Sequence, residues 1–482
     1  MTKSKKEKGE LGISAEKDEF SEWFSQLMLK ADLADYTDVS GCMVFKPGSY
    51  AIWEKVKEEI DKRFKKLGVQ NTYFPLLIPE KFLNKEKEHV EGFSPEVAWV
   101  TEAGNTKLSE KLAVRPTSET IMYPSYSKWI RSWRDLPLRY NQWNNVVRWE
   151  FKHPVPFFRT REFLWNELHT VLATEKEAME EGKEILNAYQ DFCENCMALY
   201  GLAGRKTEKE KFAGGVASYK LHYVLSSGRV IEGPCFHYDG NNFARAYDIK
   251  FLDESGKEKY VYQNTYAIST RMLGAMFAIH SDDLGLILPP KIAPNKIVIV
   301  PIIFEDSKNK VIKKAREIEK QLEEFGAFVD ERDNYKPGFK FNEWELKGIP
   351  LRLEIGPKDI EKNQVITTRR DTGKKETIRI NDLKKQLPKI LDDIQKSMFK
   401  KSEKAFKEKI EKTATIQGLI KIVNNKKVGI APLCSYSACE DMMKSKTSGA
   451  KALFIAKDKV KNEKCIICGR PAAYFVYAGK SY

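Results

Sequence analysis

The stretch from Arg148 to His169 carries a dense mixture of charged and aromatic residues that could bind an anionic ligand. It reads RWEFKHPVPFFRTREFLWNELH and contains three arginines and three glutamates. β formers (Val146, Val147, Trp149, Phe151) precede a proline-containing loop with His153, and aromatic residues follow it, which predicts two strands. A strand pair with so many charges does not bury both faces. One face is therefore expected to border a wet cavity, and a charged edge hairpin is the structural alternative.

Guanidinium groups on a sheet suit a nucleoside triphosphate, because each can fork onto phosphate oxygens. Arg148, Arg159 and Arg271 are the candidates, and a carboxylate can accept the adenine amine or help to carry a magnesium ion. The chain contains neither GxxxxGK[ST] nor GxGxxG. A glycine-rich phosphate loop is therefore not expected, and side chains on strands must hold the phosphates.

Length and charge limit the possible classes of protein. The chain has 482 residues and a formal net charge of +14, which predicts two to four domains and favours a polyanion such as nucleic acid as partner. A lysine excess can also serve solubility alone. No apolar run is long enough for a membrane helix, and the lysine-rich N-terminus does not resemble a secretory signal. The sparse cysteines fit a reducing, cytoplasmic environment.

The first half of the chain alternates helices and strands. Apolar stripes predict helices from Phe20 and from Ile52, the second ending near Gly68. Thr72–Pro79 is predicted to be a strand that contains Pro75, hence an edge or interface strand. Residues 111–120 predict a strand that runs into a helix start. There the hydroxyls of Thr117 and Ser118 serve either a ligand or helix capping.

The central region reads as a long helix followed by antiparallel strands. Thr174 and Glu177 form a predicted capping box, and Cys193 and Cys196 within that helix read as packing residues. Strands are expected on both sides of a turn at residues 226–228, then a turn-rich segment at 233–243, then a strand and a helix carrying Arg271. This section predicts an antiparallel sheet closed by a helix.

The C-terminal part predicts two further units. After the stiff segment LPPKIAP, strands alternate with helices from Lys296, which indicates an α/β domain. Residues 380–425 read as helical. The spacing of Cys434, Cys439, Cys465 and Cys468 is typical of a structural four-cysteine zinc site, with four unrelated thiols as the alternative.

These features resemble the motifs of class II aminoacyl-tRNA synthetases. The long helix with Pro75 resembles motif 1, Arg148–Glu150 resembles motif 2, and Ser269–Ala275 resembles motif 3. The segments RPTSET, RWEFKHPVPFFRTREFLW, LPPKIAP, LRLEIGP and the terminal KSY further resemble prolyl-tRNA synthetases of the archaeal and eukaryotic type. The resemblance extends from about residue 18 to Tyr482.

The resemblance implies an α+β chain with three domains. An antiparallel-sheet class II catalytic domain is expected at residues 18–288, an α/β anticodon-binding domain at 295–395 and a small zinc-binding α/β domain at 396–482, after a disordered tail at 1–17. A homodimer formed through motif 1 is also implied. Only about a hundred residues separate motifs 2 and 3, so no editing insertion is expected there.

The resemblance also implies a function: activation of proline with ATP and Mg²⁺, then transfer to tRNA(Pro). Arg148 and Arg271 would be catalytic, and ATP would contact Arg148, Glu150, Arg159, Glu232 and Arg271. Proline would contact Thr117, Glu119, Trp165, Glu167, His169, Phe212 and His237. The four cysteines would hold structural Zn²⁺. Arg352, Glu354 and Lys358 would read the anticodon, and the carboxylate of Tyr482 would point toward the active site.

The chain departs from the family pattern around the expected amino-acid pocket. The departures are Asn166, Leu168, Glu232, Cys235, Phe236, Tyr266 and Ala267. Added bulk at Leu168 and Phe236 is expected to reshape the pocket, where even one methylene affects specificity. Two alternatives therefore remain: a paralogue that activates another small or imino acid, and a tRNA-binding relative without catalysis.

Overall fold

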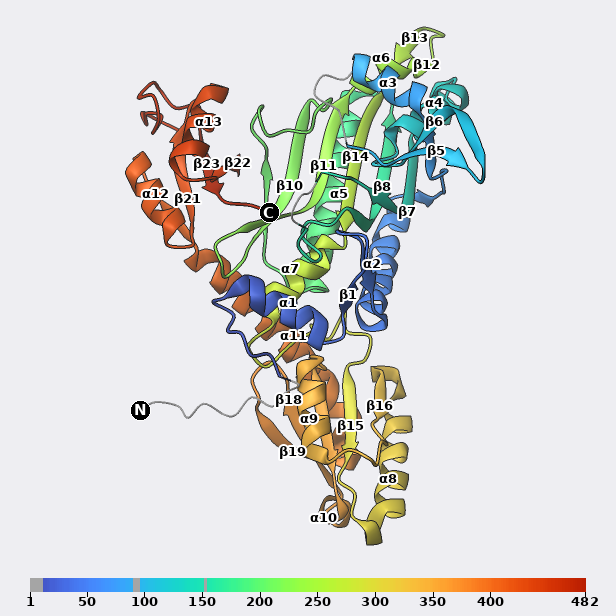
Figure 1. Ribbon diagram of the computed structural model, residues 1–482, viewed down its shortest axis with the longest axis vertical. Helices are drawn as coiled ribbons and strands as arrows, with labels where there is room; N and C mark the ends of the chain where they lie inside the picture. The colour runs from blue at the N-terminus through green and yellow to red at the C-terminus, as the bar shows by residue number, and fades with distance from the viewer. Residues whose placement is uncertain (1–11, 90–95, 151–153) are drawn as a thin grey trace.

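The computed structural model describes residues 12–89, 96–150 and 154–482. Figure 1 shows a large sheet with flanking helices, a second domain drawn in yellow to orange below it, and a smaller C-terminal domain drawn in red beside it. This is the α+β, three-domain architecture that the sequence predicts. Within the described residues, no helix is both long enough and apolar enough to cross a lipid bilayer.

The largest sheet has seven strands in the order β3-β7-β8-β14-β11-β10-β9. All neighbours are antiparallel except β3 and β7. The strands are β3 (Gln70–Asn71), β7 (Leu138–Val147), β8 (Glu162–Leu172), β9 (Leu202–Arg205), β10 (Ala217–Val224), β11 (Val230–Gly240) and β14 (Tyr262–Ser269). The predicted charged strand pair is therefore β7 and β8, which lie inside the sheet, although only the two residues of β3 cover the outer side of β7.

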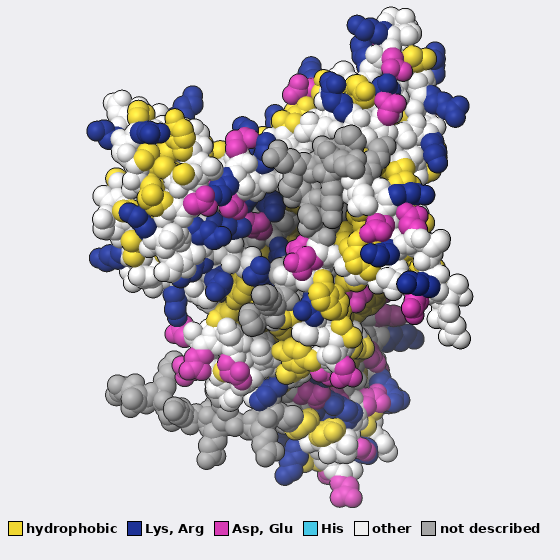
Figure 2. All heavy atoms as spheres, turned by 45° about the horizontal axis from the view of Figure 1, so that its top comes forward, with side chains coloured by type: hydrophobic (Ala, Val, Ile, Leu, Met, Phe, Trp, Pro, Cys, Tyr) yellow, Lys and Arg dark blue, Asp and Glu magenta, His cyan; other side chains and the backbone are white. Residues whose placement is uncertain are grey.

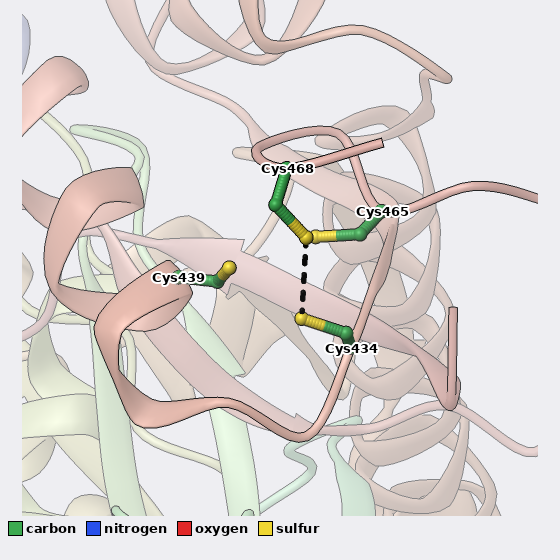
Figure 3. A group of neighbouring side chains, drawn as sticks. All are labelled: Cys434, Cys439, Cys465 and Cys468. Atoms are coloured by element: carbon green, nitrogen blue, oxygen red, sulfur yellow. Dashed lines mark hydrogen bonds between the residues drawn. The ribbon is translucent and has the colours of Figure 1, made fainter. Parts of the chain in front are cut away.

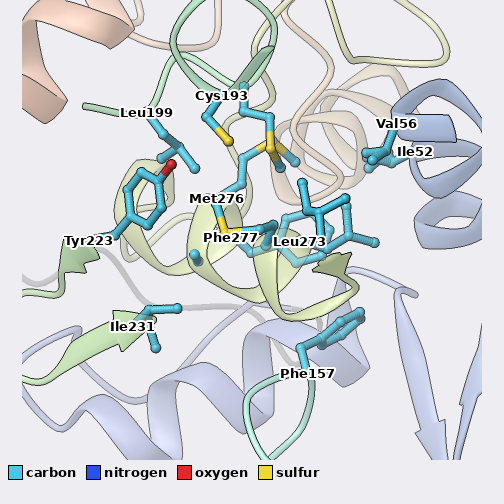
Figure 4. Packing of buried hydrophobic residues seen from close by; sticks show 14 of the residues in the cluster. Ile52, Val56, Phe157, Cys193, Leu199, Tyr223, Ile231, Leu273, Met276 and Phe277 are labelled. Atoms are coloured by element: carbon cyan, nitrogen blue, oxygen red, sulfur yellow. The ribbon is translucent and has the colours of Figure 1, made fainter. Parts of the chain in front are cut away.

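One face of this sheet packs on helices and forms the main core. Helix α5 (Glu175–Asn195) begins with the predicted capping box and lies on β11 and β14. Helices α1 (Phe20–Lys30), α2 (Pro47–Lys66) and α7 (Arg271–His280) contribute their apolar stripes, as predicted. Figure 4 shows Leu273, Met276 and Phe277 of α7 among side chains from α2 and the sheet. With one face covered, the other is left for a ligand.

Smaller elements surround the large sheet. β4 (Leu77–Pro79), β6 (Thr106–Val114) and β5 (Trp99–Ala103) form a three-stranded sheet beside α3 (Glu80–His89) and α4 (Glu119–Trp129). The two-stranded sheets are β1 (Ala34–Tyr36) with β2 (Met43–Phe45), and β12 (Lys250–Leu252) with β13 (Glu258–Tyr260). The short helices are η1 (Trp133–Asp135) and α6 (Asn242–Tyr247).

The second domain is a five-stranded mixed sheet in the order β16-β15-β17-β18-β19. Its strands are β15 (Ile297–Pro301), β16 (Ala327–Val329), β17 (Leu351–Ile355), β18 (Gln364–Arg369) and β19 (Lys375–Arg379). Its helices are η2 (Glu305–Ser307), α8 (Lys308–Gln321), η3 (Glu323–Phe325), α9 (Pro337–Leu346), α10 (Pro357–Glu361) and η4 (Ile380–Asp382). The alternation of strands and helices agrees with the prediction.

The C-terminal domain is a four-stranded sheet, β20-β21-β23-β22, with two helices. Helix α11 (Leu383–Glu408) leads into it and runs through the predicted boundary at 395/396, because its buried stripe continues to Phe406. The remaining elements are β20 (Ile410–Lys412), α12 (Ile416–Asn424), β21 (Val428–Leu433), α13 (Ser437–Lys446), β22 (Lys451–Ile455) and β23 (Tyr474–Gly479).

Several local predictions are wrong. Pro75 lies between β3 and β4 and not within a strand, since proline has no N–H to donate to a ladder. The segment predicted to be turn-rich, 233–243, is mostly the second half of β11. Phe157 and Phe158 are buried in the β7–β8 loop instead of starting β8, and Trp149 follows β7. Phe151 and His153 lie outside the described residues.

The N-terminal segment also differs from the expected tail. Residues 1–11 lie outside the described part of the chain, but Ile13 is 1% exposed and belongs to the main core. The backbone N–H of Lys17 donates to Asp283 at 2.8 Å, and its ammonium group donates to the carbonyl oxygen of Ser281 at 2.6 Å. Residues 12–17 are therefore anchored to the catalytic domain.

Candidate active site

The open face of the large sheet borders a cavity of about 530 Å³. Most of the residues predicted to bind ligands line it: Thr117, Glu119, Arg148, Glu150, Trp165, Glu167, His169, Phe212, Glu232, His237 and Arg271. Arg159 is exposed and lies outside the described lining. These residues lie up to 154 positions apart in the sequence, from Thr117 to Arg271, and the fold brings them together in one cavity. The sequence had assigned them to a single site.

Glu167 of β8 is the best-connected group at one end of the cavity. Its carboxylate accepts hydrogen bonds from the backbone N–H of Ser118 at 2.8 Å, from the Ser118 hydroxyl at 2.7 Å and from Asn144 at 2.8 Å. The indole of Trp165 donates to it at 3.2 Å. Ser118 therefore binds Glu167 with its side chain and does not cap α4, for which no side-chain cap bond is present.

The ionisation of Glu167 follows from these contacts. Burial opposes its charge, but hydrogen bonds from His169, Asn144 and Ser118 outweigh burial and hold the pKa of Glu167 below its ordinary value. The Nε2 atom of His169 lies 3.4 Å from Glu167, and its Nδ1 lies 3.1 Å from the Tyr123 hydroxyl. Glu167 is therefore ionised. The hydrogen bonds that it accepts also hold the donor side chains around it in place.

Glu119 provides a second carboxylate at the same end. It is 4% exposed and accepts a short hydrogen bond from the Thr117 hydroxyl. Glu119, Glu167 and His169 offer ligand atoms within 4.8 Å of one another, but the acceptor capacity of Glu167 is already used by its protein donors. An organic ammonium group, which could pair with Glu119, suits this arrangement better than a metal ion.

His237 and Phe212 line the same end of the cavity, where His237 of β11 and His169 of β8 both pair with Thr265 of β14. The ring centroids of His237 and Phe212 lie 4.8 Å apart, and Nδ1 of His237 lies 2.7 Å from the Ser218 hydroxyl. Burial lowers the pKa of His237 to about 3, so the imidazole is neutral at physiological pH. This end of the cavity therefore combines apolar ring surfaces with two buried carboxylates, which fits a small cationic or zwitterionic ligand.

The arginines gather at the other end of the cavity. Arg148 follows β7, and its Nε donates to the carbonyl oxygen of Pro116 at 2.9 Å while its guanidinium lies 5.2 Å from the Trp165 ring centroid. Arg271 begins α7 and donates to the carbonyl oxygen of Phe158 at 3.0 Å. Burial lowers the pKa of Arg271, and the charges of Arg148 and Arg159 act in the same direction. Such clustered cations favour a polyanion.

Glu232 of β11 lies among three lysines that the sequence reading missed. Lys206 and Lys220 lie 2.8 Å from its carboxylate, and Lys451 of β22 lies 3.2 Å from it. Burial alone would raise the pKa of Glu232, but the three ammonium groups hold it well below the ordinary value. No local motif marked these lysines, because the chain contains many and only the fold shows which ones converge.

Three of the seven departures from the family pattern, Asn166, Leu168 and Phe236, lie outside the described lining of the cavity. Successive side chains of a strand point to opposite faces, and Leu168 and Phe236 alternate with the lining residues. Both are buried, and a Cβ at Gly182 of α5 would lie 2.0 Å from the Phe236 ring. Asn166 accepts from the Tyr189 hydroxyl at 3.0 Å in the same core. The expectation that Leu168 and Phe236 fill the pocket is therefore wrong.

Glu232, Cys235, Tyr266 and Ala267 remain as departures that line the cavity. The Tyr266 ring stacks on Phe236 at 5.2 Å, and its hydroxyl donates to Glu181 at 3.1 Å. Burial raises the pKa of Cys235, which leaves it a protonated thiol. The change at the cavity surface is thus smaller than the sequence alone suggests.

The predicted anticodon residues lie in the second domain, which Figure 1 draws below the large sheet. Arg352 and Glu354 are neighbours on one face of β17, where Arg352 donates to Glu354 at 2.9 Å. Glu354 also accepts from Thr368 at 3.1 Å and is 4% exposed. Lys358 in α10 is exposed. Arg352 and Glu354 are thus occupied by each other, with side chains only 13% and 5% exposed, so Lys358 is better placed to meet a partner.

The four cysteines converge in the C-terminal domain, as Figure 3 shows. Their Sγ atoms lie within 4.8 Å of one another, and those of Cys434 and Cys468 are 3.7 Å apart. A tetrahedral zinc ion with Zn–S bonds of about 2.3 Å places its sulfur ligands about 3.8 Å apart. The cluster therefore fits a structural zinc ion.

The C-terminal residue lies beneath the arginine end of the cavity. The ring of Tyr482 stacks on Phe158 with centroids 4.8 Å apart, and its backbone N–H donates to Val230 at 3.3 Å. Phe158 is the residue whose carbonyl oxygen accepts from Arg271. The end of the chain thus supports the loop that positions Arg271.

Comparisons with known proteins agree with this architecture. The chain matches the family profiles described as tRNA synthetase class II core domain (G, H, P, S and T) at residues 99–280, anticodon binding domain at 296–390 and prolyl-tRNA synthetase, C-terminal, at 416–482. The fold and the sheet-borne cavity accordingly define a class II aminoacyl-tRNA synthetase.

Individual relatives are more specific. A proline–tRNA ligase of Ruminiclostridium cellulolyticum is 45% identical, with 98% of both chains covered. A putative proline–tRNA ligase of Saccharomyces cerevisiae is 44% identical over 98% of this chain and 73% of its own. The crystal structure of prolyl-tRNA synthetase from Cryptosporidium parvum, complexed with halofuginone and AMPPNP, has a TM-score of 0.93 at 42% identity and covers 98% of this chain and 100% of its own. The chain belongs to the prolyl-tRNA synthetase family.

Proposed function

We propose that this protein is a proline–tRNA ligase that forms prolyl-adenylate from proline and ATP and then charges tRNA(Pro). The observation that carries the proposal is one cavity with two chemically different ends. Buried carboxylates, the neutral imidazole of His237 and aromatic rings form one end, and Arg148 and Arg271 form the other. This is the arrangement required to hold a small imino acid beside a nucleoside triphosphate.

The two carboxylates at the amino-acid end of the cavity have different roles. Glu119 pairs with the secondary ammonium of proline, while Glu167 holds Ser118, Trp165 and His169 in place. Thr117 fixes Glu119 through its hydroxyl. The rings of Phe212 and Trp165 and the neutral His237 enclose the pyrrolidine. The chemistry is mainly positioning, because no covalent enzyme intermediate is needed when the proline carboxylate attacks the α-phosphate.

The nucleotide end neutralises charge. Arg148 contacts the α-phosphate, and Arg159 and Arg271 contact the outer phosphates, which stabilises the charge that develops as pyrophosphate leaves. Glu150 meets the adenine, and Glu232 belongs to the same end through its lysines. Mg²⁺ accompanies ATP and supplies further neutralisation of the triphosphate.

The remaining assignments concern the other domains. The domain ranges 18–288, 295–395 and 396–482 form part of the proposal, with Arg352, Glu354 and Lys358 as anticodon contacts and structural zinc on the four cysteines. The homodimer is supported by exposed apolar residues of the motif 1 region, among them Tyr73 at 70% exposure. Light scattering at micromolar protein is expected to give twice the chain mass. A cytoplasmic location is supported by the eight cysteines, none of which forms a disulfide.

The test is amino-acid-dependent ATP–pyrophosphate exchange over a panel of amino acids, without tRNA. Exchange strongest with proline is expected, because the substitutions at Leu168 and Phe236 face the core. Preference for another amino acid would instead identify a paralogue with altered specificity. If no amino acid supported exchange and tRNA charging also failed, the proposal would be wrong and a non-catalytic tRNA-binding protein would remain.

A further inference from the structure

Lys451 lines the cavity although it belongs to the C-terminal domain. It begins β22 and is the one described lining residue that follows Arg271 in sequence. Its ammonium group lies 3.2 Å from Glu232 and 3.3 Å from Glu210. The side chain is 26% exposed, so it is neither fully buried nor directed away from the cavity. The C-terminal domain therefore delivers a cation to the active site.

The charges around Lys451 do not cancel. Lys206, Lys220 and Lys451 all pair with Glu232, and Lys451 also pairs with Glu210, so three lysines face two carboxylates. Burial lowers the pKa of Lys206 to about 8, whereas Glu232 and Glu210 outweigh burial and raise the pKa of Lys451. Lys451 is therefore fully charged at neutral pH. Figure 2 shows Lys and Arg side chains, with Asp and Glu side chains among them, in the hollow between the catalytic and C-terminal domains.

Lys451 also retains hydrogen-bonding capacity. An ammonium group has three donors, and the two carboxylates use two of them. The third remains for an acceptor that enters the cavity. Lys206 differs, because it is almost fully buried and held at Glu232, so it supports the cluster without reaching the ligand space.

We propose that Lys451 binds a phosphate group of the nucleotide substrates, so that the C-terminal domain completes the active site. This inference rests on the proposed function, because that function identifies the ligands as ATP and tRNA. Phosphoryl oxygens reach this end of the cavity from two sources, the triphosphate of ATP and the phosphodiesters at the 3′ end of tRNA. Their chemistry toward an ammonium group is the same, so the experiment must separate them.

The test compares Lys451→Met, which removes the charge at similar length, with Lys451→Arg, which keeps it. The matched control is Lys209→Met. Lys209 pairs with Asp441 across the same domain interface but lies outside the described lining of the cavity. Thermal unfolding and zinc content of each purified variant show whether the C-terminal domain is still folded and docked.

Two kinetic outcomes support the proposal. A rise of roughly 10- to 100-fold in KM for ATP and pyrophosphate in exchange, with KM for proline unchanged and recovery in Lys451→Arg, assigns Lys451 to the triphosphate. Unchanged exchange with a comparable rise in KM for tRNA during charging assigns it to the tRNA. Wild-type kinetics for Lys451→Met, or equal losses in Lys209→Met, overturn it and leave an ion pair that only docks the domain.

A separate measurement distinguishes failure of this inference from failure of the proposed function. Calorimetric titration of ATP into wild-type protein and Lys451→Met requires no turnover. If the wild type binds ATP but activates no amino acid, the proposed function fails while the ATP arm of the test can still be read. Equal ATP affinity of the two proteins in that case would reject the contact.

Discussion

The two ends of the cavity stabilise their central carboxylates differently. Glu167 is held by hydrogen bonds from β7, β8 and the β6–α4 loop, all in the catalytic domain. Glu232 is held by ammonium groups from β10, from the segment after β9 and from β22 of the C-terminal domain. Hydrogen bonds within one sheet fix geometry, whereas ion pairs between domains depend on docking and are screened by salt where they are exposed. The amino-acid end is thus held by contacts within the catalytic domain, whereas the nucleotide end is completed only when the C-terminal domain docks.

Arg271→Ala is expected to have the largest effect on activity and to be confined to the nucleotide end. The variant removes a buried guanidinium directed at developing phosphate charge, and loss of one such contact costs about 100- to 1000-fold in rate. Pre-steady-state adenylate formation should fall by that factor while proline affinity, measured by calorimetry, stays near wild type. Arg271→Lys should recover part of the rate. Equal losses in rate and proline affinity would show that the two ends are not separate.

Glu119→Gln is expected to have the opposite pattern at the amino-acid end. Removing the charge that pairs with the substrate ammonium costs about 1.5–3 kcal/mol, or roughly 10- to 100-fold in KM for proline. KM for ATP should stay within about twofold, since the Arg148 and Arg271 contacts are unchanged. Exchange kinetics with each substrate varied in turn provide the measurement. A parallel rise in both KM values would contradict the assignment of Glu119.

Loss of zinc is expected to affect the nucleotide end more than the amino-acid end. Glu440, next to Cys439, accepts from the Thr207 hydroxyl at 3.0 Å, and Thr207 adjoins Lys206. Cys439→Ser should lower the zinc content from one ion per chain and raise KM for ATP roughly tenfold, as perturbation of supporting contacts commonly does. KM for proline should change less. Cys42→Ser, which lies outside the cluster, is the control for thiol replacement.

Acid is expected to destabilise the protein through its buried histidines. Burial lowers the pKa of His222 and of His237 from 6.5 to about 3. Between these values the unfolded chain binds protons that the native state does not, so stability falls as the pH falls, by about 1.4 kcal/mol per pH unit for each histidine. His222→Leu should flatten the decline of the unfolding temperature between pH 6.5 and 4. An unchanged profile would exclude His222 from this linkage.

The sequence predicts the cavity more completely than it predicts the environment of single residues. The resemblance to a known family identified Glu119 and Glu167, and the charge pattern identified Arg148, Arg159 and Arg271 as phosphate candidates, of which Arg159 lies outside the described lining. Lys451 was missed because it contacts Glu232, which lies more than 200 positions earlier in the chain. Lys220 lies only 12 positions from Glu232 and was missed because no local motif marks it. Phe236 was misplaced for a different reason. An accurate strand register decides which face a side chain occupies, and β11 had been predicted to end near residue 232.

Phe236→Leu is expected to have the smallest effect on the reaction and tests this assignment of faces. Phe236 is 1% exposed and packs between Tyr219 and Tyr266 against α5. Because the smaller side chain leaves part of that space unfilled, stability should fall by about 1–3 kcal/mol. KM values for proline and ATP should change less than about twofold, since His237 and Cys235 keep their places on the opposite face. The measurements are denaturant unfolding and exchange over the amino-acid panel. A change of amino-acid preference in this variant would place Phe236 at the pocket and restore the altered-specificity alternative, whereas a loss of stability alone would show that this departure belongs to the core.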